Sequence, residues 1–188
     1  MPRTQTSRSE LSVIRYGAFV SRTTEQLIAS QAVSIRSVVH DHFARRSLGA
    51  VQICLTKPRL LRELANRAQG QAAKVPEHVW TSADQEITRR PRRLLSATVI
   101  APKGAMWMLV NVSLVRNDPQ QLRLALLRGF IGVDQLIRPG AREERIFWIR
   151  HEMGVHPLTR RQEARARERI RDDETETHRL ARVLAARL

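Results

Sequence analysis

The most constraining feature of this sequence is a segment from Asp118 to Ile137 that is apolar in nearly every direction of a helical wheel. Asp118 and Pro119 predict its start, because aspartate caps the first helical N–H groups and proline suits the first helical position. Pro139 and Gly140 predict its end. A helix that is apolar on all sides has to be buried. We therefore expect a central helix against which the other elements pack.

The other elements follow from hydrophobic periodicity and from turn and cap residues. The sequence predicts helices at 23–49, 58–68 and 141–153, a strand at 51–56, a hairpin of strands at 96–101 and 106–112, and a long C-terminal helix that begins with a capping box at 159–162. Gly70 is expected to stop the second helix, and residues 69–94 to form a loop with one short element. The prediction is an α+β fold, a small antiparallel or mixed sheet packed with helices.

A single domain at 11–188 is expected after a polar arm at 1–10, because a chain of this length buries enough apolar surface for one core. Cys54 is the only cysteine and lies in an apolar run, so it is expected to be a buried, inert thiol. No apolar h-region follows the basic start, and no stretch is long enough to span a bilayer. The sequence therefore predicts a cytoplasmic protein without a membrane partner.

The formal net charge is +15, and arginine carries nearly all of the positive charge because the chain has only three lysines. Such a field attracts phosphate and acidic partners. Codon preference in a GC-rich genome would explain the choice of arginine over lysine, although not the whole excess. The candidate nucleic-acid contacts lie in a loop and at the front of the terminal helix: Arg89, Arg90, Arg92, Arg93, Arg161 and Arg165.

Two observations limit what these arginines can do. Glu163 and Arg167 are four residues apart on the terminal helix and are expected to form an ordinary solvated pair. No aromatic residues lie between the arginines to stack on bases. Only non-specific electrostatic contact with nucleic acid is therefore expected.

Two histidine pairs approach metal sites in composition but not in spacing. His151 and His156 are five residues apart, whereas the HExxH zinc motif needs histidines at i and i+4 on one helical face. Gly154 predicts that a helix ends between them, in a turn with two surface histidines. His40 and His42 are two apart and lie on different helical faces. No metal site, cofactor, nucleophilic triad or phosphate-binding loop is identified, and none is expected.

Four segments of the second half, together with the arginine- and glutamate-rich terminal helix, carry a family resemblance: Met106–Val112, Leu126–Gln135, Arg138–Arg142 and Met153–Thr159. They are similar to a family of small zincin-like metallopeptidases from actinobacteria and their mobile elements. In that family an apolar strand ending near an asparagine leads to a helix with the HExxH motif and then to an Arg-Pro-Gly turn. The resemblance covers residues 50–188 and implies a zincin-like fold.

The chain departs from the family where the metal would be held. Arg128, Gly129 and Gly132 match the positions of the first histidine, the catalytic glutamate and the second histidine. Arginine offers no lone pair to zinc, and glycine has no side chain. The resemblance therefore implies a degenerate metallopeptidase that has lost both the metal and the general base.

The resemblance also implies where a third metal ligand would lie on the terminal helix. Glu176 is the best match and Glu174 the next. One hypothesis is that Arg128 points into the vacated site and pairs with one of these carboxylates, since a charge on an otherwise apolar helix needs a partner. In the alternative, Arg128 lies at a helix edge and the acidic run is a solvated face.

Gly129 and Gly132 also have a structural meaning, because each costs about 1 kcal/mol relative to alanine in a helix interior. They would either let a neighbouring element approach closely or record drift after catalysis was lost. The sequence leaves both explanations open.

The leading functional expectation is a non-catalytic zincin-like protein, a pseudoenzyme that binds a macromolecular partner, either protein or nucleic acid. The first alternative is a basic nucleic-acid-binding protein for which the family resemblance is incidental. The second is a hydrolase with an unrecognised site.

Overall fold

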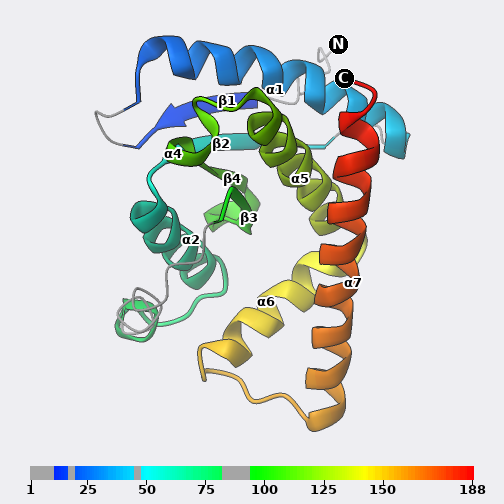
Figure 1. Ribbon diagram of the computed structural model, residues 1–188. Helices are drawn as coiled ribbons and strands as arrows, with labels where there is room; N and C mark the ends of the chain where they lie inside the picture. The colour runs from blue at the N-terminus through cyan, green and yellow to red at the C-terminus, as the bar shows by residue number, and fades with distance from the viewer. Residues whose placement is uncertain (1–10, 17–19, 45–47, 82–93) are drawn as a thin grey trace, which may run out of the picture.

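The computed structural model describes residues 11–16, 20–44, 48–81 and 94–188, which form a four-stranded sheet surrounded by helices (Figure 1). The strands are β1 (Leu11–Arg15), β2 (Val51–Thr56), β3 (Ser96–Ile100) and β4 (Met106–Asn111). The helices are α1 (Arg22–Phe43), α2 (Pro58–Ala72), α4 (Val112–Val115), α5 (Pro119–Ile137), α6 (Ala141–Glu152) and α7 (Arg160–Ala185), with a 3-10 turn at Pro102–Gly104. The predicted α+β class is confirmed.

The sheet is mixed and has the strand order β1-β2-β4-β3. β1, β2 and β4 are parallel, and β3 runs antiparallel to β4 as the predicted hairpin requires. β1 is an edge strand that was not predicted from the sequence. Its register on β2, from Leu11 opposite Val51 to Arg15 opposite Leu55, joins segments separated by the whole of α1.

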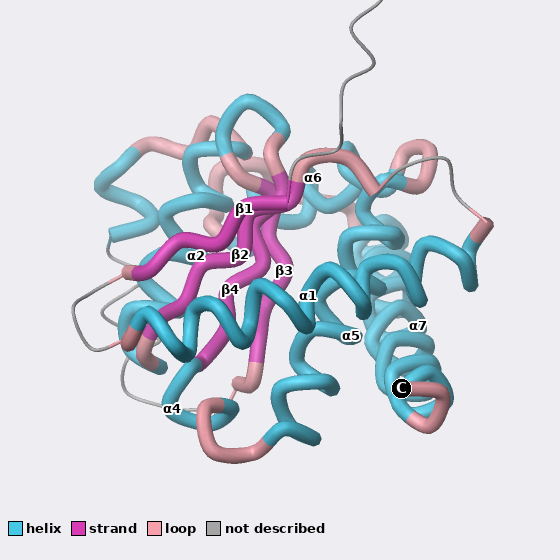
Figure 2. Tube along the Cα trace, turned by 90° about the horizontal axis from the view of Figure 1, so that it is seen from above, coloured by secondary structure: helices cyan, strands magenta, loops and turns pink. Residues whose placement is uncertain are grey.

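The two faces of the sheet are covered by different helices (Figure 2). On one face α1, α5 and α7 bury a core that contains Ile35, Phe130 and Leu184. On the other face α2 packs Leu61 against the β2 residue Cys54. The sheet is therefore a layer between two sets of helices, which accounts for the nearly unbroken apolar sequence of β2 and β4.

The central position predicted for α5 is confirmed. The Asp118 carboxylate accepts hydrogen bonds from the N–H groups of Gln120 and Gln121, each at 3.0 Å, and Pro119 is the first helical residue. Buried residues occur in all directions around the helix, among them Leu126, Leu127, Phe130, Ile131 and Val133. α5 packs on β3, β4, α1 and α7, so its position fixes those of the elements around it.

Several predicted boundaries were wrong for tertiary reasons. α2 continues through Gly70 to Ala72, because Gly70 makes room for the Trp80 ring instead of ending the helix. α1 ends at Phe43 with Ala44 in the left-handed conformation, well before residue 49. α4 was not predicted. The capping box at the start of α7 is confirmed, since Thr159 and Gln162 exchange both hydrogen bonds.

None of the helices within the described residues combines the length and the apolar character needed to cross a membrane.

Candidate functional site

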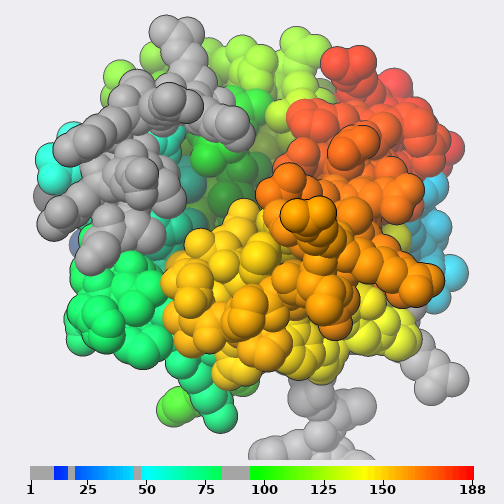
Figure 3. Space-filling model, turned by 90° about the horizontal axis from the view of Figure 1, so that it is seen from below, coloured from blue at the N-terminus to red at the C-terminus, as the bar shows by residue number. Residues whose placement is uncertain are grey.

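A large open cleft lies between β3, α5, α6 and α7. Its volume is about 1380 Å³. β3 and the two residues before it form one side, α5 contributes Arg128, Gly132 and Gln135, and α6 and α7 complete the enclosure. Figure 3 shows the face of the molecule on which α6 and the first half of α7 lie side by side. In this cleft Arg128 and Gly132 of α5 come together with Asp172, Asp173 and Glu174 of α7.

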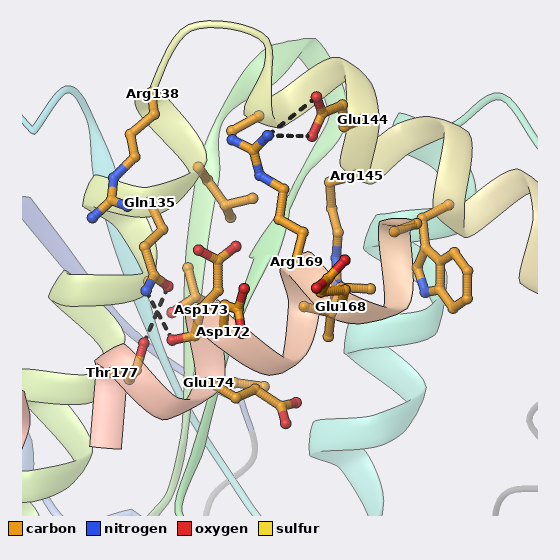
Figure 4. A pocket seen from close by; sticks show the side chains of 18 of the residues that line it. Gln135, Arg138, Glu144, Arg145, Glu168, Arg169, Asp172, Asp173, Glu174 and Thr177 are labelled. Carbon is orange, nitrogen blue, oxygen red and sulfur yellow. Dashed lines mark hydrogen bonds and ion pairs between the residues drawn. The ribbon is translucent and has the colours of Figure 1, made fainter. Parts of the chain in front are cut away.

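The cleft lining has equal numbers of positively and negatively charged side chains in the part that the structure describes. Among the described residues, the lining contains five arginines and five carboxylates: Arg128, Arg138, Arg145, Arg165, Arg169, Glu144, Glu168, Asp172, Asp173 and Glu174. Some of them pair with one another, as Figure 4 shows for Arg169 and Glu144, whose closest atoms are 2.9 Å apart. Because the whole chain carries +15, its surplus positive charge lies outside this described part of the lining.

Arg128 lines the cleft without a partner among the described residues. Its Nε atom is buried and has no hydrogen-bond acceptor. Burial lowers the pKa of its guanidinium below the ordinary value, and the positive charge of nearby Arg182 lowers it further. The hypothesis that Arg128 pairs with Glu174 or Glu176 is therefore wrong for this structure, although Arg128 and Glu174 do line the same cleft.

Glu176 is occupied by another arginine. Its carboxylate accepts a hydrogen bond from Arg138 Nη2 at 3.0 Å and from Gln135 Nε2 at 3.1 Å. Gln135 also donates to the Asp173 carbonyl and accepts from the Thr177 hydroxyl (Figure 4). Arg138 directly follows the last residue of α5 and contacts α7, so this network joins the two helices and is structural.

The acidic stretch of α7 is divided by burial. Glu174 is exposed, whereas Asp173 and Glu176 are half-buried. Burial raises the pKa of the Asp173 carboxyl above its ordinary value, against the opposing effects of Arg138 and Arg169. The alternative of a solvated acidic face therefore fits Asp172 and Glu174, which are exposed, but not Asp173 and Glu176.

The two glycines of α5 allow close approach to the sheet. A Cβ on Gly129 would collide with the side chain of Met108 on β4, and a Cβ on Gly132 would lie 3.0 Å from Thr98 Oγ1 on β3. The strand is also bonded to the helix there, because the Thr98 hydroxyl donates to the Gly129 carbonyl at 3.0 Å. Of the two explanations left open by the sequence, the structure supports close packing.

These contacts also show that the three α5 positions singled out by the sequence resemblance do not all face the cleft. Arg128 and Gly132 line the cleft, while Gly129 faces Met108 in the core. A side chain at 129 would enter the sheet interface rather than the cleft.

The helix end predicted between His151 and His156 is confirmed. His151 is near the end of α6, where its Nδ1 accepts from the Leu158 N–H at 3.3 Å, and Gly154 turns the chain with a φ of +69°. His156 lies beyond that turn against Phe147, with ring centroids 5.8 Å apart. The described residues contain no cluster of three histidine, cysteine or acidic side chains able to hold a metal ion.

The predicted nucleic-acid contacts are only partly visible. Arg89, Arg90, Arg92 and Arg93 lie outside the described residues. Arg161 is exposed on α7, and Arg165 lines the cleft. The solvated pair of Glu163 and Arg167 is confirmed at 2.6 Å.

The outer edge of β3 pairs with no strand in the part of the chain that the structure describes, and this free edge was not predicted from the sequence. Leu95 accepts from the Asn111 N–H at 2.9 Å, and Ala101 donates to the Ala105 carbonyl at 2.8 Å. In an antiparallel pair the bonded residues alternate, so the N–H and C=O groups of Ser96 and Thr98 point away from β4. Both residues line the cleft. Only the strand order reveals this edge, because the sequence of β3 resembles that of an interior strand.

No protein-family model matches the chain, and neither a curated protein nor a solved structure is significantly similar to it.

Proposed function

We propose that this protein is a non-catalytic, zincin-like protein that binds an extended segment of a protein partner in the cleft between β3, α5, α6 and α7. The observation that carries the proposal is the pair Arg128 and Gly132 on the α5 wall of the cleft. These residues match the positions of two metal ligands in the family that the sequence resembles, and neither can bind zinc.

The free edge of β3 supports an extended polypeptide as the partner. The outward N–H and C=O groups of Ser96 and Thr98 are available to pair with an added strand, which is a common mode of peptide recognition. Ser96 and Thr98 are held in place by their hydroxyl groups, which donate to the α5 carbonyls of Ala125 and Gly129, each at 3.0 Å. A rigid edge reduces the entropy cost of binding.

The balanced lining charge also favours a polypeptide over a polyanion. Carboxylates at Glu168, Asp172 and Glu174 would repel consecutive phosphates, whereas a peptide presents few charges and many backbone groups.

Two measurements test this proposal. Metal analysis of the protein purified without chelators is expected to find no stoichiometric zinc, and stoichiometric zinc would contradict the non-catalytic part. The cleft is tested by amide hydrogen exchange with a neutral strand peptide, acetyl-Thr-Val-Gln-Val-Thr-amide, in excess. We expect slower exchange at Ser96 and Thr98 and no change at β1, the opposite edge of the sheet. Equal exchange with and without peptide would argue against strand addition at β3.

A second function is favoured by one observation outside the cleft. A smaller hollow along α7, of about 570 Å³, is lined by Arg171, Arg179, Arg182 and His178 with Glu174 as its carboxylate. This excess of cations is suited to binding the phosphate groups of a nucleic acid non-specifically.

A further inference from the structure

Arg128 carries a cationic donor for which the described part of the chain supplies no acceptor. Its Nε is buried without a hydrogen bond, while the residue contributes to the cleft surface. A buried donor without an acceptor loses its hydration and gains nothing in exchange. Such a group is costly in the free protein, and the side chain that carries it lines the cleft, where a ligand can bring an acceptor to the guanidinium.

Neither Glu176 nor Arg182, two charged residues of α7, supplies Arg128 with an acceptor. Glu176 accepts from Arg138 and Gln135. Arg182 is close enough to affect Arg128 electrostatically, but it has the same charge. Arg128 is therefore a cation beside a second cation, in a position from which water is partly excluded. An incoming anion would relieve both the missing hydrogen bond and the repulsion.

The position of Arg128 relative to β3 indicates what kind of ligand can bring that anion. Arg128 directly precedes Gly129, whose carbonyl accepts the hydroxyl hydrogen of Thr98 at 3.0 Å. The same threonine is in contact range of Gly132, one helical turn further along α5. Arg128 thus belongs to the α5 wall next to the middle of the free strand edge.

We propose that Arg128 recognises a carboxylate side chain of an extended peptide that pairs with the outer edge of β3. This inference rests on the proposed function and adds the chemistry of the partner: a strand with an acidic residue. A guanidinium binds a carboxylate through parallel hydrogen bonds, which fixes the register as well as adding affinity. A single acidic residue suits the site, because Asp172 and Glu174 oppose a ligand with dense negative charge.

The experiment compares two peptides that differ only in the central side chain, acetyl-Thr-Val-Glu-Val-Thr-amide and its glutamine counterpart. Binding is followed by ¹H–¹⁵N spectra of protein labelled at arginine Nε and by hydrogen exchange at Ser96 and Thr98. The glutamate peptide is expected to bind about tenfold or more tightly than the glutamine peptide, as charge-assisted hydrogen bonds are about twice as strong as neutral ones. It should shift the Arg128 Nε–H resonance and slow its exchange.

Variants assign the effect to Arg128. Arg128→Gln should remove the preference for the glutamate peptide while leaving the weak binding of the glutamine peptide, and Arg128→Lys should keep part of the preference. Arg59→Gln is the matched control, because it removes an exposed arginine of α2 that lies outside the cleft lining. It should leave the preference unchanged. Since the two peptides are compared on the wild-type protein as well, the result does not depend on the folding of any variant.

The outcomes separate this inference from the function on which it rests. Equal affinity for the two peptides, with the β3 amides protected by both, would overturn the role of Arg128 and leave strand addition intact. Protection by neither peptide would overturn both. If inorganic phosphate or an oligonucleotide shifts the Arg128 resonance and the glutamate peptide does not, the proposal that Arg128 binds a carboxylate would be overturned. The ligand of Arg128 would then be a phosphate.

Discussion

Gly129 and Gly132 occur where α5 comes closest to the sheet, and their missing side chains are part of the packing. Met108 fills the space beside Gly129, and the Thr98 hydroxyl occupies the space beside Gly132. Met108 is completely buried, so its side chain cannot move into solvent to admit another atom. A helix usually gains about 1 kcal/mol when glycine becomes alanine, but here the packing cost opposes that gain.

Gly129→Ala is expected to destabilise the protein by about 1–3 kcal/mol, the range for overpacking a buried site. Urea unfolding would measure the change. Gly132→Ala is the comparison, and it should cost less because its contact with Thr98 is tight without being a collision. A Gly129→Ala variant as stable as the wild type would mean that Met108 can repack, and the double variant Gly129→Ala with Met108→Val should then show no further gain.

Cys54 gives a pH-dependent prediction. It is fully buried in the α2 side of the core, and burial raises the pKa of its thiol from 9.0 to about 12. In the unfolded chain the thiol ionises near its ordinary pKa, while in the folded protein it stays protonated. The stability that this thiol contributes is therefore complete below about pH 9 and declines as the pH rises from 9 towards 12.

Free energies of unfolding of the wild type and Cys54→Ala at pH 7, 8 and 9.5 would test this. The wild type should lose stability relative to the variant only at the highest pH. A difference that is the same at all three values would contradict the raised pKa. In the native state the thiol should also react slowly with a disulfide reagent at pH 8.

The interface between α5 and α7 contains a few polar contacts among apolar ones. Arg138 bridges Asp134 of its own helix and Glu176 of α7, with closest distances of 3.4 Å and 3.0 Å. Gln135 adds bonds to the backbone and side chains of α7. Two neighbouring glutamates on α7 thus have different roles, because Glu176 faces α5 and Glu174 is exposed.

Glu176→Gln is expected to lower the free energy of unfolding by about 1–3 kcal/mol, since Arg138 and Gln135 both lose a charged acceptor. Glu174→Gln should change stability by no more than about 0.5 kcal/mol, as is usual for exposed positions. Thermal and urea unfolding of the two variants provide the comparison. Similar losses in both would show that the network contributes nothing specific.

At the scale of the whole molecule, the excess of arginine among the described residues lies outside the cleft lining. The cleft lining is balanced, and the hollow on α7 that contains Arg171, Arg179 and Arg182 is strongly cationic. Attraction of nucleic acid to this part of the surface should be sensitive to salt rather than to sequence.

Binding of a short DNA duplex, measured by fluorescence anisotropy between 50 and 200 mM salt, is expected to be weak and to fall steeply with salt. Replacing Arg171, Arg179 and Arg182 by glutamine should reduce the slope of log K against log salt by about 0.9 for each phosphate that the variant no longer neutralises. Arg167→Gln is a control, because Arg167 is already paired with Glu163. Tight binding that persists at high salt would favour the nucleic-acid function over the peptide cleft.

The local features were determined by the sequence alone. The cap at Asp118, the proline at 119, the capping box at Thr159 and the alternation of β3 and β4 each act within a few residues, so the elements they predict are present with nearly the expected bounds. Burial of α5 was also predictable, because a helix that is apolar on every side has no other stable environment.

The tertiary structure decided which distant segments meet. In the sheet, β1 pairs with β2 and β3 lies at an edge. Between the helices, Arg138 rather than Arg128 pairs with Glu176. At the sheet, Gly129 packs against Met108. Each of these results depends on strand order and helix packing over long sequence separations. Residue type and local spacing limit the possible partners of a side chain, but only the assembled core determines which of them lies within reach.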